Sequence, residues 1–251
     1  MTNRKILVLS RHGKAPQRPD GGSIDSLVPE TVTDLYERVG CPLQGFVTEE
    51  GITKERTYLH HSPAVRTRDT GEVILAGALN LQPEQGKNPP RSIEDVARYD
   101  FGGVTAVEDE RIFFSKPYIN MAVYNANNAV CNGNVDHWLA HPDATEHDNA
   151  PIESYRSVAA RVRAATTDAV QRFMRDEHDF GTLVTHAGII DTAVVILIGT
   201  AQRVESSADI GGGFEMAQGA QLVIDKTPSG MYTVTLERNG QSYKVDLDKL
   251  R

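Results

Sequence analysis

A lack of cysteines, of basic excess and of long hydrophobic runs limits what this chain can be. Among its 251 residues only Cys41 and Cys131 are cysteines, so it has no paired framework for a disulfide-stapled secreted domain. Lysine and arginine total 26 against 34 acidic residues, a formal net charge of −8, which argues against a nucleic-acid-binding surface. The longest apolar stretches are far too short to span a membrane. We therefore expect no nucleic-acid or membrane partner and a small substrate.

The length and the order of apolar patterns predict an α/β protein. The first apolar run is short and charged residues follow at once, so it is not a secretion signal, and we expect a cytoplasmic location. Residues 1–251 suffice for one large domain, with an insertion at about 104–150. Strand and helix patterns alternate along the chain before a β-rich tail over 219–245 that carries hairpin signals. An exposed strand edge in such a sheet would allow, but not require, a homo-oligomer.

The tripeptide Arg11-His12-Gly13 is the most informative motif. It follows an apolar run that predicts a buried strand, and ligand crevices in open α/β sheets lie beyond the carboxyl ends of the strands. A neutral imidazole can attack phosphorus, a guanidinium can hold phosphate oxygens, and glycine allows close backbone approach. A strand-end histidine can equally be an ordinary hydrogen-bonded residue, so the tripeptide alone does not decide.

Arg66 is a second candidate phosphate ligand. Ser62 has the chemistry of a helix N-cap and Pro63 suits a first helical turn, so the sequence predicts a helix with Arg66 in or near its first turn. Unpaired N–H groups and the positive dipole end favour an anion there. Alternatively, Arg66 pairs with Asp69 or Glu72 along its own helix.

His186 repeats the pattern of His12. The apolar run 181–185 predicts a strand that ends in His186, followed by the small residue Ala187 before a helical pattern. His186 on its own could simply cap that helix. Two strands that end in histidine, together with Arg66, indicate a phosphate site more strongly than any one of these residues does.

The chain resembles the histidine phosphatase superfamily, also called the phosphoglycerate-mutase-like superfamily. Four segments carry the resemblance in the right order, and they read LVLSRHG, HHSPAVRTRDTGEVIL, PIESYRSVAARVRAA and LVTHAGIID. Residues 14–57 and 108–150 stay largely unmatched. The resemblance implies a three-layer α/β/α sandwich with a mostly parallel central sheet, a variable cap insertion and, in this chain, the β-rich tail.

The resemblance also implies roles for the four candidate residues. His12 would accept the phosphoryl group, Arg11 and Arg66 would bind phosphate oxygens, and His186 would stabilise the group in transfer. Ala187 stands where an acidic residue follows the second histidine in the acid-phosphatase and phytase branch, so the chain is more similar to the branch of small-molecule phosphatases and mutases. The implied activity is a phosphomonoesterase that needs no cofactor or metal. Gly13, Ala187, Arg98 and Glu153 are the expected substrate-binding residues.

The general acid is the one expected catalytic residue that has no clear match in this sequence. Many members of that branch carry a glutamate three residues before a Phe-Gly pair, where this chain has Arg98 before Phe101. Asp100 is the first candidate, because it adjoins the pair and a positioned proton donor helps an alkoxide leave. Alternatively, Arg98 is a substrate-binding cation and the nearby acids are solvated. The other acidic candidates are, in order, Glu94, Asp95 and Glu108.

Three further features have two interpretations each. Glu153 opens the long helical pattern 151–175, where it either contacts the catalytic group or only complements the helix N-terminus. His137, His141 and His147 contain ligand chemistry for a metal, but Pro142 interrupts a continuous helix, so we expect a polar loop. The glycines 211–213 could approach a phosphate, yet they lack the context of a nucleotide loop and predict a flexible turn.

Two alternative functions remain open on the sequence. A mutase would return the phosphoryl group to another substrate oxygen instead of to water. A weakly catalytic module that binds a phosphorylated ligand or phosphoprotein is the other alternative, and Arg98 in the acid position suggests it. The sequence does not identify the leaving group.

Overall fold

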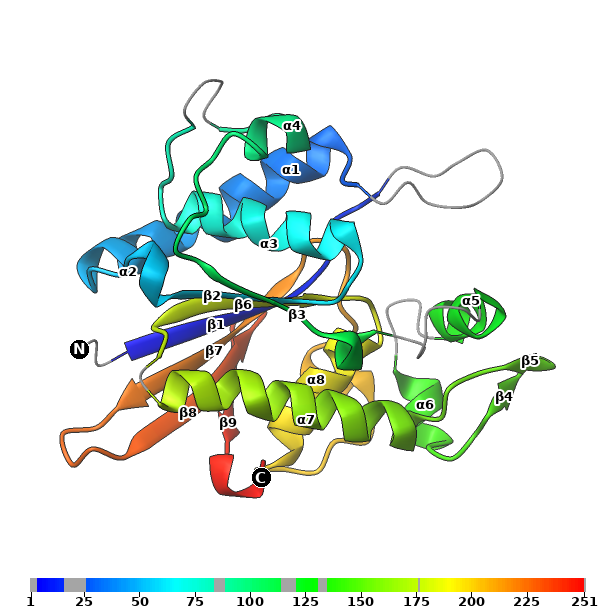
Figure 1. Ribbon diagram of the computed structural model, residues 1–251. Coiled ribbons are helices and arrows are strands. Elements are labelled where there is room, and N and C mark those ends of the chain that lie inside the picture. The colour runs from blue at the N-terminus through cyan, green and yellow to red at the C-terminus, as the bar shows by residue number, and fades with distance from the viewer. Residues whose placement is uncertain are drawn as a thin grey trace.

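A seven-stranded mixed sheet forms the centre of the protein (Figure 1). The computed structural model describes residues 4–15, 26–83, 89–113, 121–130, 135–175 and 177–250. The strand order is β3-β2-β6-β1-β7-β8-β9. The parallel strands are β1 (Arg4–Arg11), β2 (Thr57–His61), β3 (Thr105–Glu108) and β6 (Phe180–Thr185). The antiparallel strands are β7 (Gly219–Lys226), β8 (Tyr232–Arg238) and β9 (Gln241–Val245).

Helices cover both faces of this sheet, which confirms the three-layer arrangement (Figure 1). One face carries α1 (Pro29–Leu35), α2 (Gln44–Glu49), α3 (Val65–Ala78) and α4 (Ile93–Val96). The other carries α7 (Tyr155–Met174) and α8 (Ile189–Gly199). Beside this second layer lie α5 (Met121–Val130), α6 (Asp136–Ala140) and the small pair β4 (Glu146–His147) and β5 (Ala150–Pro151). Short helical turns are η1 (Tyr36–Gly40), η2 (Cys41–Leu43), η3 (Lys54–Arg56), η4 (Glu110–Ile112), η5 (Ser207–Ile210) and η6 (Leu247–Lys249).

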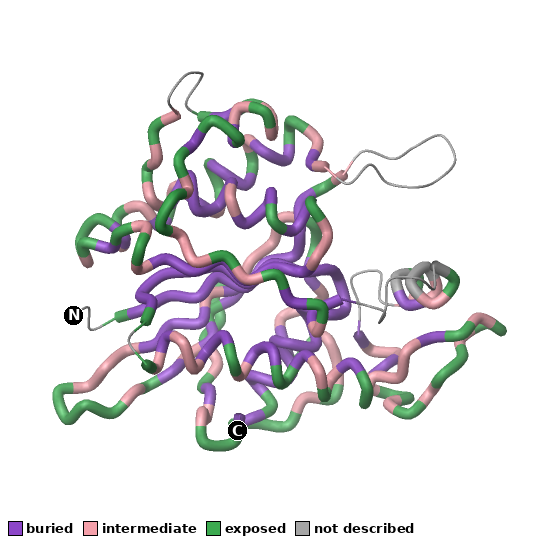
Figure 2. The backbone as a smooth tube through the Cα atoms, viewed as in Figure 1, coloured by how far each residue is buried: buried purple, intermediate pink, exposed green. Residues whose placement is uncertain are grey.

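Strand β1 is buried on both faces, as its continuous apolar run predicts. Leu7 and Leu9 pack with α7 and α8, whereas Ile6 and Val8 pack toward α2 and α3. The alternation follows from the period of two in a strand, which sends successive side chains to opposite faces. Figure 2 shows the resulting band of buried backbone through the middle of the sheet. The first strand is therefore fixed on both sides, and its carboxyl end has a defined position.

The predicted helix start at Ser62 is wrong. Helix α3 begins at Val65 with Ala64 in the N-cap position, and no side chain caps it. The Ser62 hydroxyl instead contacts the hydroxyl of Thr67 and the ring of His186. Thr67 Oγ1 donates to the Ala64 carbonyl at 2.6 Å, so this hydroxyl does not cap the first-turn N–H groups either.

The long helix and the β-rich tail agree more closely with the predictions from the sequence. Helix α7 runs over Tyr155–Met174 and the side chain of Ser154 accepts from the Ser157 N–H at its start. The alternating tail forms the antiparallel strands β7 to β9, which extend the sheet beyond β1. Within the expected insertion, Thr105–Glu108 belong to the central sheet as β3, and residues 114–120 and 131–134 lie outside the described residues.

Gly40 and Gly45 give a matched test of the close packing of the turn η1 against helix α3. A Cβ at Gly40 would lie 2.6 Å from the Ile74 carbonyl oxygen and 3.0 Å from the Gly77 Cα, both backbone atoms of α3. We expect Gly40→Ala to lower the free energy of unfolding by about 1–3 kcal/mol in urea titrations, since backbone cannot move aside as a side chain can. Gly45→Ala in α2 meets no atom within 4 Å, so it should raise stability by up to about 1 kcal/mol through helix propensity. Equal effects of the two substitutions would contradict the close contact.

Candidate active site

His12 and His186 meet beyond the carboxyl ends of two neighbouring parallel strands. Arg11 pairs with Thr185 in the ladder between β1 and β6, so the two histidines follow the same rung. Their ring centroids are 4.9 Å apart and the rings are nearly perpendicular, at 66°. Both side chains are buried. The structure thus brings together two imidazoles that are remote in sequence.

The hydrogen bonds of His12 define which ring nitrogen is free to react. Its Nδ1 lies 2.7 Å from the Gly13 carbonyl, which can only accept, so Nδ1 carries the proton. Nε2 is then a lone-pair nitrogen, and it accepts from Nε of Arg66 at 3.4 Å. Burial, with help from the charges of Arg66 and Arg11, lowers the pKa of His12 to about 3. Near neutral pH, His12 therefore presents an uncharged nucleophilic nitrogen.

His186 is held in the opposite tautomer. Its Nδ1 lies 3.4 Å from Nη2 of Arg66, a group that can only donate, so Nδ1 accepts. The proton is then on Nε2, which donates to Ser62 Oγ at 3.0 Å. Burial and the neighbouring His12, Arg66 and Arg11 hold the pKa of His186 well below its usual value. Ser62 therefore orients His186, a role that its sequence position did not reveal.

Two guanidinium groups border the imidazole pair. Arg66, in the first turn of α3, contacts both rings and is itself buried. The N–H groups at the start of that 14-residue helix add to the positive potential. Arg11 ends β1 and donates through Nη1 to the Phe214 carbonyl at 2.8 Å. The Gly13 N–H donates to Thr70 Oγ1, and a Cβ at this glycine would lie 2.3 Å from the Thr31 side chain.

Asp100 lies at the other end of the sheet from the histidines. Its carboxylate is exposed and pairs with Lys54 in η3, the turn just before the start of β2. The carboxyl end of β2, by contrast, is at His61, on the side of His12 and His186. Bonds from Lys54 and the Gly102 N–H lower the pKa of Asp100, which keeps it ionised. The structure does not bring the first candidate acid to the site.

The rest of segment 92–100 also lies away from the histidines. Tyr99 bridges to Pro83, which follows the carboxyl end of α3, whereas Arg66 is at that helix's amino end. Arg98 and Glu94 are exposed on this segment, and Asp95 Oδ2 accepts from the Arg91 N–H. Neither the proposed substrate-binding arginine nor these alternative acids reaches the imidazole pair.

Glu153 supports a neighbouring turn. Its carboxylate accepts from Arg161 through both oxygens, at 2.9 and 2.6 Å, and from Ser157 at 2.9 Å. Arg161 in turn donates to the Arg111 carbonyl in η4. Glu153 precedes the N-cap residue Ser154, and the first turn of α7 holds no acidic residue, so the interpretation of Glu153 as a first-turn acid is wrong. Ala187 is buried directly after His186, and its carbonyl accepts from Ile189.

The turn after β3 reaches the site through Phe113, an aromatic residue for which the sequence alone leaves contact with a leaving group and ordinary packing both open. The Phe113 ring lies 4.9 Å from the His186 ring, edge to face at 81°. The turn is anchored by Asp109, which accepts from His60 Nε2 at 2.9 Å and from Arg111, and by Thr185 Oγ1 donating to the Ile112 carbonyl. No local motif marks Phe113, because its role depends on a short edge strand that places η4 beside β6.

This chain is similar to known proteins in its fold rather than in its sequence. No protein-family model and no curated protein matches it. Among solved structures, the protein called mycobacterial hydrolase 2 superposes with a TM-score of 0.52 at 18% identity, over 99% of this chain and 96% of the other. Phosphoglycerate mutase from Bacillus anthracis str. Sterne superposes with a TM-score of 0.50 at 16% identity, over the same 99% and 96%. The chain has the phosphoglycerate-mutase fold. The fold implied by the sequence resemblance is thereby confirmed.

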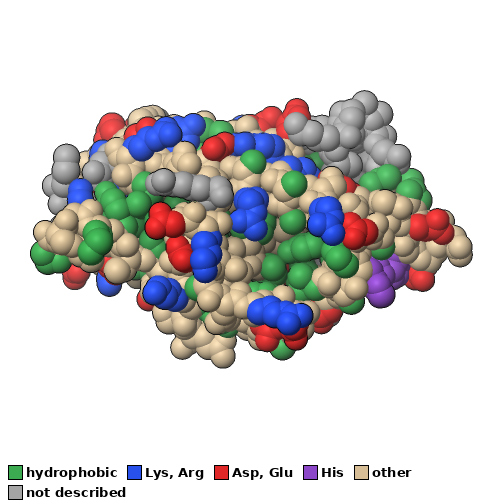
Figure 3. All heavy atoms as spheres, turned by 90° about the horizontal axis from the view of Figure 1, so that it is seen from below, with side chains coloured by type: hydrophobic (Ala, Val, Ile, Leu, Met, Phe, Trp, Pro, Cys, Tyr) green, Lys and Arg blue, Asp and Glu red, His purple; other side chains and the backbone are tan. Residues whose placement is uncertain are grey.

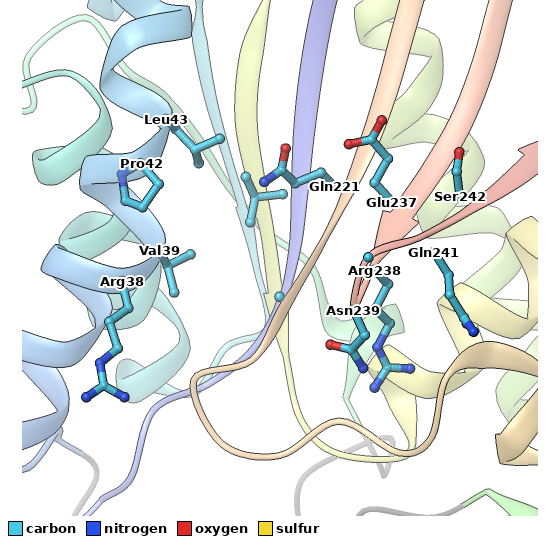
Figure 4. Close-up of a pocket in the computed structure, with 13 residues that line it drawn as sticks. Arg38, Val39, Pro42, Leu43, Gln221, Glu237, Arg238, Asn239, Gln241 and Ser242 are labelled. Carbon is cyan, nitrogen blue, oxygen red and sulfur yellow. The ribbon is translucent and has the colours of Figure 1, made fainter.

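Two cavities lie elsewhere on this phosphoglycerate-mutase fold. One, of about 480 Å³, lies between the η1–η2 turns and strands β7 to β9, and Figure 4 shows Arg38 and Pro42 facing Gln221 and Glu237 across it. The other, of about 820 Å³, lies between α7 and strands β8 and β9. Neither cavity is lined by the histidines or by Arg11 and Arg66.

The remaining surface features concern charge and metal ligands. In the view from below (Figure 3), basic and acidic side chains are interspersed, and the described residues of this face form no continuous basic stripe. The ring of His137 lies 5.1 Å from His141 and 4.4 Å from His147, measured between centroids. Within the described residues no group of three ligand side chains is arranged to hold a metal ion. No helix in the described ranges has the length and apolarity to cross a membrane.

The neutral state of His12 predicts a pH dependence of stability. A histidine whose pKa is lowered by folding binds fewer protons in the folded state, so its full contribution is present above the usual pKa of 6.5 and is lost as pH falls toward about 3. Between pH 7 and pH 5, the wild type should lose about 2 kcal/mol more unfolding free energy than His12→Gln. Urea titrations of both proteins at pH 7 and pH 5 in phosphate-free buffer measure this difference. Identical slopes for the wild type and His12→Gln would show that His12 is not held neutral.

Proposed function

We propose that this protein is a phosphomonoesterase that hydrolyses a small phosphorylated substrate through a phosphohistidine on His12. The observation that carries the proposal is the pair of uncharged imidazoles with one guanidinium, that of Arg66, hydrogen-bonded to both. The charges of Arg66 and Arg11 act on both imidazoles, so an anion that binds beside these rings meets positive charge from two guanidinium groups. Positioning and charge stabilisation are what phosphoryl transfer chiefly needs.

The chemistry follows from the tautomers. His12 Nε2 attacks phosphorus in line, a P–N bond forms, and the ester P–O bond breaks with its electron pair leaving on the alcohol oxygen. Water then attacks the phosphohistidine, and the P–N bond breaks with its electron pair returning to Nε2. The proton that the water loses goes to the carboxylate left by the general acid, so phosphate leaves and both the neutral imidazole and the acid are restored. The Gly13 carbonyl keeps the proton on Nδ1 throughout. Burial is the main cause of the lowered pKa of His186, and a bound phosphate offsets only the smaller contribution of the neighbouring positive charges.

The leaving oxygen needs a proton, and the turn after β3 carries acidic residues at the same edge of the sheet as the histidines. The carboxylate of Asp109 already accepts hydrogen bonds from His60 and Arg111. Glu108 is the last residue of β3 and acts electrostatically on His61 of β2, one strand further from His12 than β6 is. Glu110 opens η4, the turn that ends in Phe113 against His186. We therefore assign the general acid to Glu110.

No specific observation favours either alternative function, the mutase or the phosphate-binding module. The binding-module interpretation depended on Arg98 in the acid position, and Arg98 lies on a segment away from the histidines. A mutase would convert a phosphoglycerate to its isomer, whereas the proposed hydrolase releases free phosphate from it. Phosphorus NMR of the products separates these two outcomes.

The proposal predicts that His12→Ala loses at least about a thousandfold in turnover of p-nitrophenyl phosphate, because the nucleophile is removed. Circular dichroism should show an intact fold. Acid quenching of the wild type should trap a base-stable, acid-labile phosphoryl group that is absent from His12→Ala, with His147→Ala as the matched histidine control. Near-normal turnover by His12→Ala would remove the phosphohistidine mechanism.

The acid assignment predicts a dependence on the leaving group. Glu110→Gln should slow hydrolysis of an alkyl phosphate by about a hundredfold or more, yet affect p-nitrophenyl phosphate little, because that leaving group departs without a proton. Glu108→Gln is the matched control and should hydrolyse both substrates at the rates of the wild type. Loss with Glu108→Gln alone would transfer the role to Glu108.

A further inference from the structure

Arg238, at the end of β8, is a buried arginine wrapped by a glycine loop. It is 3% exposed and donates to the carbonyls of Ile210, Gly212 and Gly213 at 2.7, 2.6 and 2.9 Å. Its guanidinium carbon lies 3.7 Å from the centre of the Phe214 ring, within cation–π range. Figure 4 shows the side chain leaving β8 beside Asn239. The loop thus encloses the cation with main-chain oxygens on one side and an aromatic face on the other.

The glycines make this enclosure possible. Gly211 and Gly212 have φ values of 78° and 90°, which side chains rarely allow, so carbonyls close together in sequence can turn toward one guanidinium. Burial lowers the pKa of Arg238, which shows the cost of placing a cation there. Hydrogen bonds to charged donors offset that cost. Residues 211–213 therefore bind an arginine of the same chain.

The last residue of the loop connects this arginine to the active site. The Phe214 carbonyl accepts from Arg11 Nη1 at 2.8 Å, and its N–H donates to Asp191 at 2.9 Å. The other Asp191 oxygen accepts from the Gly188 N–H at 2.8 Å, in the turn that follows His186. Phe214 therefore contacts Arg11 directly and is linked through Asp191 to the turn that follows His186.

We propose that Arg238 is a positioning residue for the phosphate site. It fixes the loop 210–214 so that the Phe214 carbonyl holds one nitrogen of Arg11 and thereby aims the rest of that guanidinium fork at the anion. Without this cation, a loop with three consecutive glycines gains conformational freedom, and the carbonyl that orients Arg11 loses its fixed place. The inference rests on the proposed function only in taking phosphate as the ligand.

Arg238→Lys tests the proposal because it keeps the charge and removes the planar fork. Calorimetric titration with inorganic phosphate should give a dissociation constant about tenfold weaker than that of the wild type, the size expected for a misaligned charged hydrogen bond. KM for p-nitrophenyl phosphate should rise by a similar factor. Arg203→Lys is the matched control, because Arg203 is 87% exposed at its side chain and pairs with Glu205.

A double-mutant cycle separates positioning from general destabilisation. If Arg238 acts through Arg11, then Arg238→Lys should weaken phosphate binding much less in an Arg11→Lys background than in the wild type. Additive losses, or an unchanged dissociation constant in Arg238→Lys with only a lower melting temperature, would overturn the proposal. Should Arg238→Lys not fold, Gly212→Ala displaces the same loop at an open position, and unaltered phosphate binding there would overturn it equally.

The outcomes also separate this inference from the hydrolase assignment. A wild type that binds phosphate in an Arg238-dependent manner but hydrolyses no phosphate ester would support the positioning role and contradict the proposed function. If the wild type hydrolyses phosphate esters and Arg238→Lys binds phosphate as tightly as the wild type, the proposed function is supported and the positioning role is contradicted. A wild type that binds no inorganic phosphate would contradict the positioning role itself.

Discussion

Arg66 lies between two imidazoles that burial keeps uncharged, and the rest of the site is arranged around that contact. Three cations so close together would repel one another in a low-dielectric pocket, so the histidines give up their protons and accept from the guanidinium instead. The Gly13 carbonyl and the Ser62 hydroxyl hold the remaining ring protons on the far sides of the two rings. The nitrogens without protons therefore both face Arg66, where an anion would bind.

Sheet topology makes this contact possible. Parallel strands β1 and β6 are neighbours, and the pairing of Arg11 with Thr185 continues into a bond from the His12 N–H to the Thr185 carbonyl at 2.9 Å. A shift of one residue in this register would turn His186 to the other face of the sheet. Burial of β1 on both faces opposes such a shift, so the core of the protein sets the distance between the two rings.

The sequence predicts the parts of the structure whose signals are local. Apolar runs predict β1 and β6, helical spacing predicts α7, and alternation predicts the tail, while two strands ending in histidine mark the pair that meets. Ser62 shows where local reasoning fails, because its side chain fits an N-cap and yet contacts His186, 124 positions along the chain. Tertiary contacts of this kind leave no pattern in one sequence.

The general acid could not be placed for a related reason. The Phe101-Gly102 pair suggested Asp100, but the chain returns to the carboxyl edge only through β3, four residues long, whose half-exposed pattern is a weak strand signal. Asp100 and Glu110 are ten residues apart in the sequence, and the whole of β3 lies between them. Position relative to the sheet, rather than distance from a motif, decides which carboxylate approaches the imidazoles.

Two loops that touch the site are each held by buried charge. The turn with Phe113 is fixed by Asp109, where burial raises the carboxyl pKa but bonds from His60 and Arg111 outweigh it and hold the pKa below its usual range. The loop with Phe214 is fixed by Arg238 through main-chain carbonyls. Buried charges of this kind add little net stability, but removing one partner leaves the other unpaired at high cost. Such a network tolerates little displacement of the loops it holds, so the two loops give the imidazoles and Arg11 neighbours with fixed positions.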